Sequence, residues 1–197
     1  MDMRAVGLFL AAATALLGSP GPGIAALLAV GKSQGWSGGL RYFAGLQIGL
    51  AAVVVGSGAG LVSLLTASPA VTRAMVLAAT IYLVYLSYKI ATAPVGEKPT
   101  NKPRSFSPLA GLLLGITNPK AYLAIGSLLA SPLQLTATER GNIGLKVVLC
   151  VAVIIVVDIV WLWVGVAVGR TTLTPFAERG MNVAMAATIL IATAFSF

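Results

Sequence analysis

Apolar residues occur along this chain in long, nearly uninterrupted stretches, and most charged residues fall between them. A helix needs about 20 mainly apolar residues to cross the roughly 30 Å hydrocarbon core of a bilayer. Read from charge to charge, the pattern predicts an all-α integral membrane protein. Its six predicted transmembrane helices are residues 5–30, 42–65, 69–91, 106–130, 146–169 and 176–197.

The clearest interruption of the apolar pattern is residues 93–105, where three prolines and a cluster of charges stand together. This linker divides a single membrane transport domain, residues 1–197, into halves of about 1–92 and 106–197. Each half has a proline break in its first helix, at Pro20 and Pro119. Three helices per half would make the second half enter the bilayer from the opposite side, which predicts a 3+3 inverted repeat with broken first and fourth helices. The alternative is that the breaks reflect only the general frequency of proline in membrane helices.

Composition supports the membrane prediction and removes several function classes. Of 197 residues, 58% are hydrophobic and 9% charged, whereas soluble domains average about 25% charged residues. The net charge of +8 is best explained by Lys and Arg residues that orient the helices in the membrane and contact phospholipids, so no nucleic-acid partner is expected. With one cysteine, Cys150, and no histidine, no disulfide, serine–histidine dyad or cysteine metal cluster can form within the chain. We expect no enzyme activity, no metal and no cofactor, and we expect Cys150 to serve packing.

Lys and Arg residues are distributed unequally between alternate loops, which predicts the orientation. Eight lie at residues 31–41, 89–105 and 170–179, and the other side holds four, namely Arg4, Arg73, Arg140 and Lys146. This bias places the linker in the cytoplasm and both termini outside. Trp36, Trp161 and Trp163 fit an aromatic belt at the membrane interfaces.

Four GxxxG patterns occur in the predicted spans: Gly45/Gly49, Gly56/Gly60, Gly111/Gly115 and Gly165/Gly169. Small residues four apart let helix backbones approach closely in lipid. We expect them to pack helices within one chain, with a homo-oligomer interface as the alternative.

The two proline breaks are the first candidates for a substrate site. A proline removes a backbone donor and exposes polar backbone at membrane depth, where it must face protein or a cavity. In Asn118-Pro119-Lys120 the cation stands beside a new helix N-terminus, which suits a substrate carboxylate. In Ser19-Pro20-Gly21-Pro22-Gly23 the glycines permit close approach of a ligand to the backbone.

Lys120 and Asp158 lie deep in predicted spans, where a charge costs about 2.5–3.5 kcal/mol on insertion scales. Each is therefore a candidate for function. Asp158 could bind a substrate ammonium group or carry a coupling proton. The alternatives are that Lys120 and Asp158 pair with each other, or that Lys120 extends to an interface. Gln47, Tyr82 and Tyr122 could line the same cavity, with hydrogen bonding between helices as the alternative.

These residues together resemble the LysE/RhtB family of amino-acid exporters. The resemblance rests on Ser19-Pro20-Gly21-Pro22-Gly23, on Tyr82-Leu83-Val84-Tyr85-Leu86 before Lys89, on Asn118-Pro119-Lys120-Ala121 and on Asp158-Ile159-Val160-Trp161. It implies a multi-pass secondary transporter of the bacterial cytoplasmic (inner) membrane that exports amino acids or related small metabolites using the proton motive force. The substrate-binding residues expected from the two breaks and from the polar residues within the spans are Pro20, Gly21, Pro22, Gly23, Gln47, Asn118, Pro119, Lys120 and Asp158.

The chain also departs from the family pattern. Many members have an acidic residue where this chain has Gly23, and another that aligns with Leu50. A Phe-Leu-Pro-Gln-Phe-like stretch is missing around residues 127–132. These departures leave the substrate and the coupling open. The competing hypothesis is a non-transporting membrane assembly or scaffold subunit, in which the proline breaks serve packing alone.

Overall fold

The computed structural model describes residues 1–197 except 20, 59–68, 93–94, 96–105, 171–173 and 195–197. Within the described residues the chain is helical and contains no strand. The helices are α1 (Met3–Gly18), α2 (Pro22–Gly58), α4 (Pro69–Ala91), α5 (Pro108–Thr117), α6 (Pro119–Leu129), α7 (Glu139–Gly169) and α8 (Pro175–Ala194). The expected all-α class is confirmed for this part of the chain.

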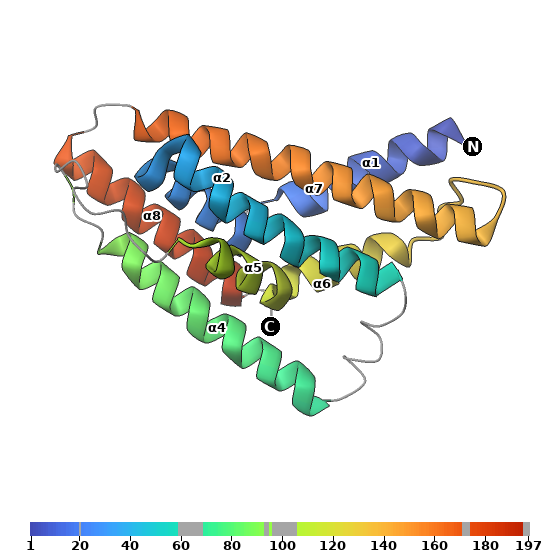
Figure 1. Ribbon diagram of the computed structural model, residues 1–197, viewed down its shortest axis with the longest axis horizontal. Coiled ribbons are helices and arrows are strands. Elements are labelled where there is room, and N and C mark those ends of the chain that lie inside the picture. Colours follow the sequence, from blue (N-terminus) through green and yellow to red (C-terminus); the bar gives the residue numbers. More distant parts are fainter. Residues whose placement is uncertain (20, 59–68, 93–94, 96–105, 171–173, 195–197) are drawn as a thin grey trace.

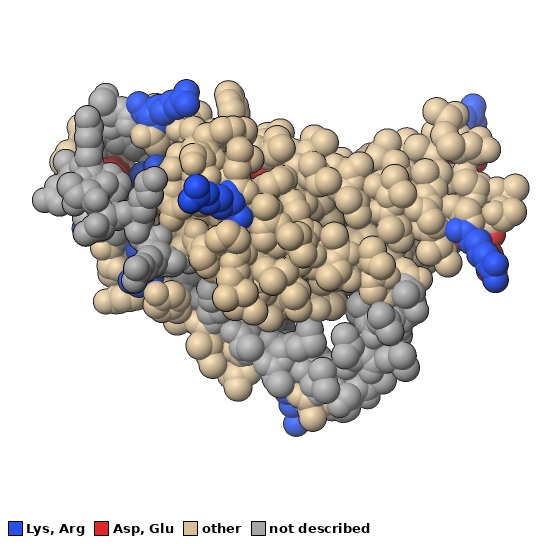
Figure 2. All heavy atoms as spheres, viewed as in Figure 1, with Lys and Arg blue, Asp and Glu red and all other residues tan. Residues whose placement is uncertain are grey.

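Two of these helices, α2 and α7, are long and apolar enough to cross a membrane. The pair α5 and α6 adds a third span if it is counted as one helix with a 56° bend. Figure 2 shows Lys and Arg mostly towards the two ends of the long axis, with a wide surface of few charged atoms between them, as a lipid-facing belt requires. The fold is therefore that of a membrane protein, and the six-span count stays a prediction.

The sequence prediction was wrong about a loop at residues 31–41. This segment is helical on both sides of Gly35, where φ is 64°, ψ is −161° and the two parts of α2 meet at a kink. Glycine alone adopts this backbone readily because it has no Cβ. In Figure 1 the chain runs from the N-terminus along α1 and the first part of α2, and then returns along the rest of α2. Trp36 thus lies in a helix, 40% exposed.

Helix α2 is the centre of the bundle and packs mainly against α7 and α5 (Figure 1). Its second part meets α5 through glycines: a Cβ on Gly49 would lie 2.6 Å from Leu112 O, and one on Gly115 would lie 2.7 Å from Leu46 O. These backbones touch because no side chain separates them.

The first part of α2 meets α7 in the same way. A Cβ on Gly165 would lie 2.5 Å from Leu28 O, and one on Gly169 would lie 2.5 Å from Lys32 O. Packing within one chain is thus confirmed for three of the four GxxxG patterns. Gly60 of the fourth lies outside the described residues.

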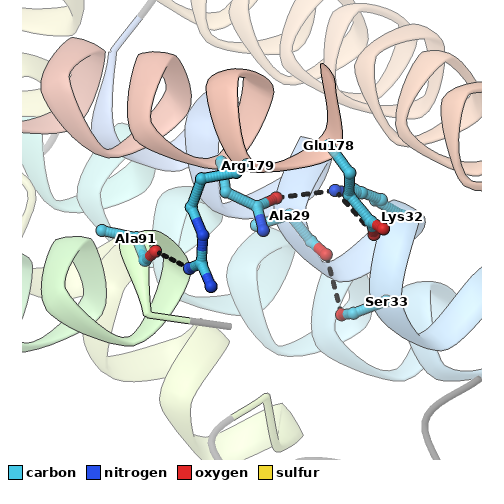
Figure 3. A network of polar contacts seen from close by, with 7 residues as sticks. Ala29, Lys32, Ser33, Ala91, Glu178 and Arg179 are labelled. Atoms are coloured by element: carbon cyan, nitrogen blue, oxygen red, sulfur yellow. Dashed lines mark hydrogen bonds and ion pairs between the residues drawn. The ribbon is translucent and has the colours of Figure 1, made fainter. Parts of the chain in front are cut away.

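Polar contacts join α2, α8 and α4 at the end of the bundle where α7 ends (Figure 3). Lys32 Nζ lies 2.6 Å from Asn182 Oδ1 and 3.3 Å from Glu178 Oε1. Arg179 Nη1 donates to Ala91 O at 2.7 Å. Asn182 is buried, and the ammonium of Lys32 supplies a hydrogen-bond donor to its side-chain oxygen.

Lys146 is another residue that the sequence prediction placed wrongly. It was counted among loop cations, but α7 begins at Glu139, and Lys146 is 2% exposed on that helix. Its Nζ donates to Ser131 O at 2.6 Å, beside the C-terminus of α6. A cation there satisfies backbone carbonyls that the helix leaves unpaired and opposes the negative end of its dipole.

Candidate functional site

The first helix break separates α1 from α2. Helix α1 ends at Gly18, Ser19 is extended with φ −67° and ψ 144°, and α2 begins at Pro22. Side chains from other helices satisfy the carbonyls that the break exposes. The ammonium of Lys120 donates to Ser19 O, and Trp161 Nε1 donates to Gly18 O at 3.3 Å. Hydrogen bonds from a cation on α6 and an indole on α7 thus stabilise the backbone at the break.

The second break lies at Asn118, which is both the C-cap of α5 and the N-cap of α6. Its side-chain oxygen accepts a hydrogen bond from Lys120 N at 3.2 Å, which satisfies one of the donors left unpaired at a helix start. Pro119 occupies the first position of α6, where its missing N–H costs nothing. The N-terminus of α6, with its positive partial charge, is thereby formed inside the bundle.

The two breaks lie against each other. A Cβ added to Gly21 would be 2.8 Å from Lys120 Cδ, and one added to Gly23 would be 3.7 Å from Asn118 Nδ2. At Gly21 a side chain would therefore displace Lys120. The absence of a side chain at this position lets the Asn118-Pro119-Lys120 segment approach the first break.

Asp158, from α7, is 6% exposed and reaches the same region. Its Oδ2 accepts a hydrogen bond of 2.7 Å from Gln47 Nε2, on α2. The amide donor stabilises a carboxylate that is otherwise largely removed from solvent. Gln47 therefore forms a hydrogen bond between helices, which was one of the two roles expected for this residue.

A cavity of about 50 Å³ lies where these elements meet. Since one water needs roughly 10–15 Å³ measured in this way, it can hold a few waters or a small ligand group. Its described lining combines the charged Lys120 and Asp158 with the amide Asn118. The remaining lining residues are glycine or apolar: Leu16, Leu17, Gly21, Gly23, Ile24, Leu50, Ala121, Ala124 and Ile154.

Comparison with protein families gives one match. The family model described as LysE type translocator matches residues 14–197, nearly the whole chain. The chain belongs to this family. It is therefore a membrane translocator of small molecules. No curated protein and no solved structure matches it significantly.

The packing of the helices in this translocator brings most of the predicted site residues together. Gly21, Gly23, Asn118, Lys120 and Asp158 line the cavity, and Gln47 contacts it through Asp158. Pro22 and Pro119 begin α2 and α6 and are not among its lining residues. Pro20 and the side chain of Tyr82 lie outside the described residues, and the half-buried Tyr122 is also not among the lining residues.

Sequence reasoning missed the apolar wall of the translocator's cavity and the role of Trp161. Helical spacing carried a signal for the wall: Ile154 is four residues before Asp158, Ala124 is four after Lys120, and Leu50 is three after Gln47. Residues three or four apart share a helix face. No spacing along the sequence indicated the hydrogen bond from Trp161 to Gly18 O, and Trp161 was instead expected at the membrane interface. Trp163 is 61% exposed, as a lipid-facing residue would be.

Proposed function

We propose that this translocator exports amino acids or related small metabolites across the bacterial cytoplasmic membrane, driven by the proton motive force. The supporting observation is a cavity at two helix breaks that is lined by one ammonium group, Lys120, and one carboxylate, Asp158. An α-amino acid carries the complementary pair of charges. Buried charges are tolerated where each meets an opposite charge or a polar partner.

The proposed carboxylate site consists of Lys120 and the N-terminus of α6. Lys120 donates to the carbonyl of Ser19, and an incoming carboxylate would take that carbonyl's place, because an anion is the stronger acceptor for an ammonium group. The helix N-terminus at Asn118 adds a favourable dipole.

The proposed ammonium site is Asp158, held in place by Gln47. A carboxylate can bind either a proton or a substrate ammonium group, so the two ligands would compete for it. A proton arriving from outside would release the substrate, and loss of that proton towards the cytoplasm would prepare the site for the next substrate. This competition couples export to proton entry. Asp158 is thus assigned both the binding and the coupling role.

The proposed topology is six spans in a 3+3 inverted repeat, with residues 93–105 in the cytoplasm and both termini outside. In support, broken helices stand at corresponding places in the two halves, at Ser19–Pro22 and at Asn118. Cysteines introduced one at a time at either end of each predicted span, in a Cys150→Ala background, would be labelled with an impermeant maleimide. Labelling of the linker from the periplasm would contradict the proposed orientation.

The function is tested with purified protein in liposomes loaded with a mixture of amino acids, under an imposed pH gradient. Gradient-dependent efflux of a few amino acids is expected from the unaltered protein. The isosteric Asp158→Asn variant keeps an acceptor for Gln47 but cannot carry the proton, so its efflux should lose the dependence on the gradient. Glu139→Asn removes an exposed carboxylate from the same helix and serves as the control. Absence of all efflux from correctly inserted protein would contradict amino-acid export and favour another small metabolite as the substrate.

A further inference from the structure

The described walls of the cavity divide into a charged part and an apolar part. Lys120 and Asp158 supply the charges, and Asn118 supplies an amide beside them. A ligand whose ammonium and carboxylate groups meet Asp158 and Lys120 uses both charged groups that line the described part of the cavity. For any further charge on that ligand, the described lining offers only one other polar side chain, Asn118.

Some of the apolar lining residues lie to one side of the charges. Helix α6 runs from Lys120 past Ala124 to the segment 130–138, and α7 leads from that segment past Ile154 to Asp158. Ala124 and Ile154 are therefore one helical turn from the two charged groups, both towards segment 130–138. Leu50 adds a wall from α2. Leu50 is 8% exposed and Ile154 5% exposed, so neither wall is open to solvent.

The size of the cavity limits the ligand further. A volume of about 50 Å³ corresponds to a few water molecules at roughly 10–15 Å³ each. Leu50 and Ile154 are branched side chains in the apolar part of the lining, so they are candidates to limit the length of a ligand side chain. A charged or strongly polar side chain placed there would lose its hydration without gaining a partner.

We propose that the translocator selects amino acids with a small apolar side chain, of the size of alanine to valine, and that Leu50 and Ile154 are the residues that set this limit. This inference rests on the proposed function, since it assumes that the amino-acid backbone occupies the charged part of the cavity. It adds the class of side chain, which the charged residues alone do not determine.

The first experiment measures exchange into liposomes that contain the unaltered protein, with labelled alanine, valine, leucine, phenylalanine, lysine and glutamate each offered separately. Alanine and valine should exchange at least about tenfold faster than lysine and glutamate, because a buried charge without a partner is strongly disfavoured. Equal or faster exchange of lysine or glutamate would overturn the side-chain assignment while leaving amino-acid transport established. If no amino acid exchanges, the proposed function itself is wrong, and this inference falls with it.

The second experiment tests the assigned residues by a ratio that does not depend on how much protein folds. Leu50→Ala enlarges the cavity, so the ratio of leucine to alanine exchange should rise by roughly tenfold, as expected when a pocket gains room for one or two methylene groups. Ile154→Val, a milder change, should shift the same ratio in the same direction. Leu123→Ala, on α6 and 65% exposed, is the matched control and should leave the ratio unchanged. An unchanged ratio in both Leu50→Ala and Ile154→Val would remove these residues from the specificity site.

Discussion

Gln47 and Asp158 face each other across the contact between α2 and α7, with Gln47 Nε2 2.7 Å from Asp158 Oδ2. The residues are far apart in the sequence, yet this bond connects a half-buried amide to a carboxylate that is 6% exposed. A donor to a buried carboxylate both stabilises its charge and restricts its orientation. Transport should therefore depend on Gln47 although it is not among the residues that line the cavity.

Replacing Gln47 with leucine should slow gradient-driven efflux by at least about tenfold, because a hydrogen bond to a charged group contributes about 1.5–3 kcal/mol. Efflux from liposomes with equal amounts of inserted protein is the measurement. Gln134→Leu, at an exposed position between α6 and α7, makes the same change outside the cavity. Equal efflux from both variants would show that the amide does not support Asp158.

Lys120→Met should reduce efflux at least about tenfold, because it removes the cation proposed to bind the substrate carboxylate and leaves Ser19 O without this donor. Lys120→Arg keeps the charge but changes its geometry, and should recover part of the activity. The control is Lys89→Met, since Lys89 is exposed near the end of α4. Normal efflux from Lys120→Met would exclude Lys120 from the substrate site.

Trp161→Phe keeps an aromatic ring but loses the N–H that donates to Gly18 O at 3.3 Å. The free energy of unfolding should fall by about 1 kcal/mol, the usual contribution of one hydrogen bond. Trp163→Phe, two residues further along α7 and 61% exposed, should change stability much less. Unfolding in mixed micelles by a denaturing detergent gives both values, and equal effects would argue against a specific role for the Trp161 indole.

Gly165→Ala should destabilise the protein by roughly 1–3 kcal/mol, since its Cβ would lie 2.5 Å from Leu28 O and force α2 away from α7. The matched control is Gly144→Ala in the same helix, where a Cβ meets nothing within 4 Å. Alanine is the better helix former by about 1 kcal/mol, so this control should be neutral or stabilising. Thermal unfolding of both variants distinguishes close packing from helix propensity, and a neutral Gly165→Ala would contradict the packing described.

Lys32 and Glu178 should be energetically coupled by about 1 kcal/mol or less, since their 3.3 Å ion pair is only partly shielded, with side-chain exposures of 12% and 25%. A double-mutant cycle with Lys32→Met and Glu178→Gln, read by the free energy of unfolding, measures this coupling. Lys32→Met alone should cost more than Glu178→Gln, because it also leaves the buried Asn182 without its 2.6 Å partner. The reverse order would show that Asn182 finds another partner.

Local sequence signals predicted several helix ends well. The predicted third span, residues 69–91, has the bounds of α4, and both proline motifs lie where helices break. Local signals failed at residues 31–41, because charged and polar residues there resemble a loop, whereas a single glycine with positive φ is enough to join the two helical parts of α2. They also failed for Lys146, which lies in a buried helical position next to carbonyls of another segment.

The sequence by itself determined the membrane class, the helical content and the positions of the breaks. These follow from properties of short segments: apolar length, and a proline that has no N–H to donate. It also supplied Lys120 and Asp158 as costly charges that required partners. Only the tertiary structure decided what those partners are, because Gln47, Ser19 and Trp161 meet the site through helix contacts that no spacing along the chain encodes. The apolar wall that limits the ligand depends likewise on how α2, α6 and α7 pack together.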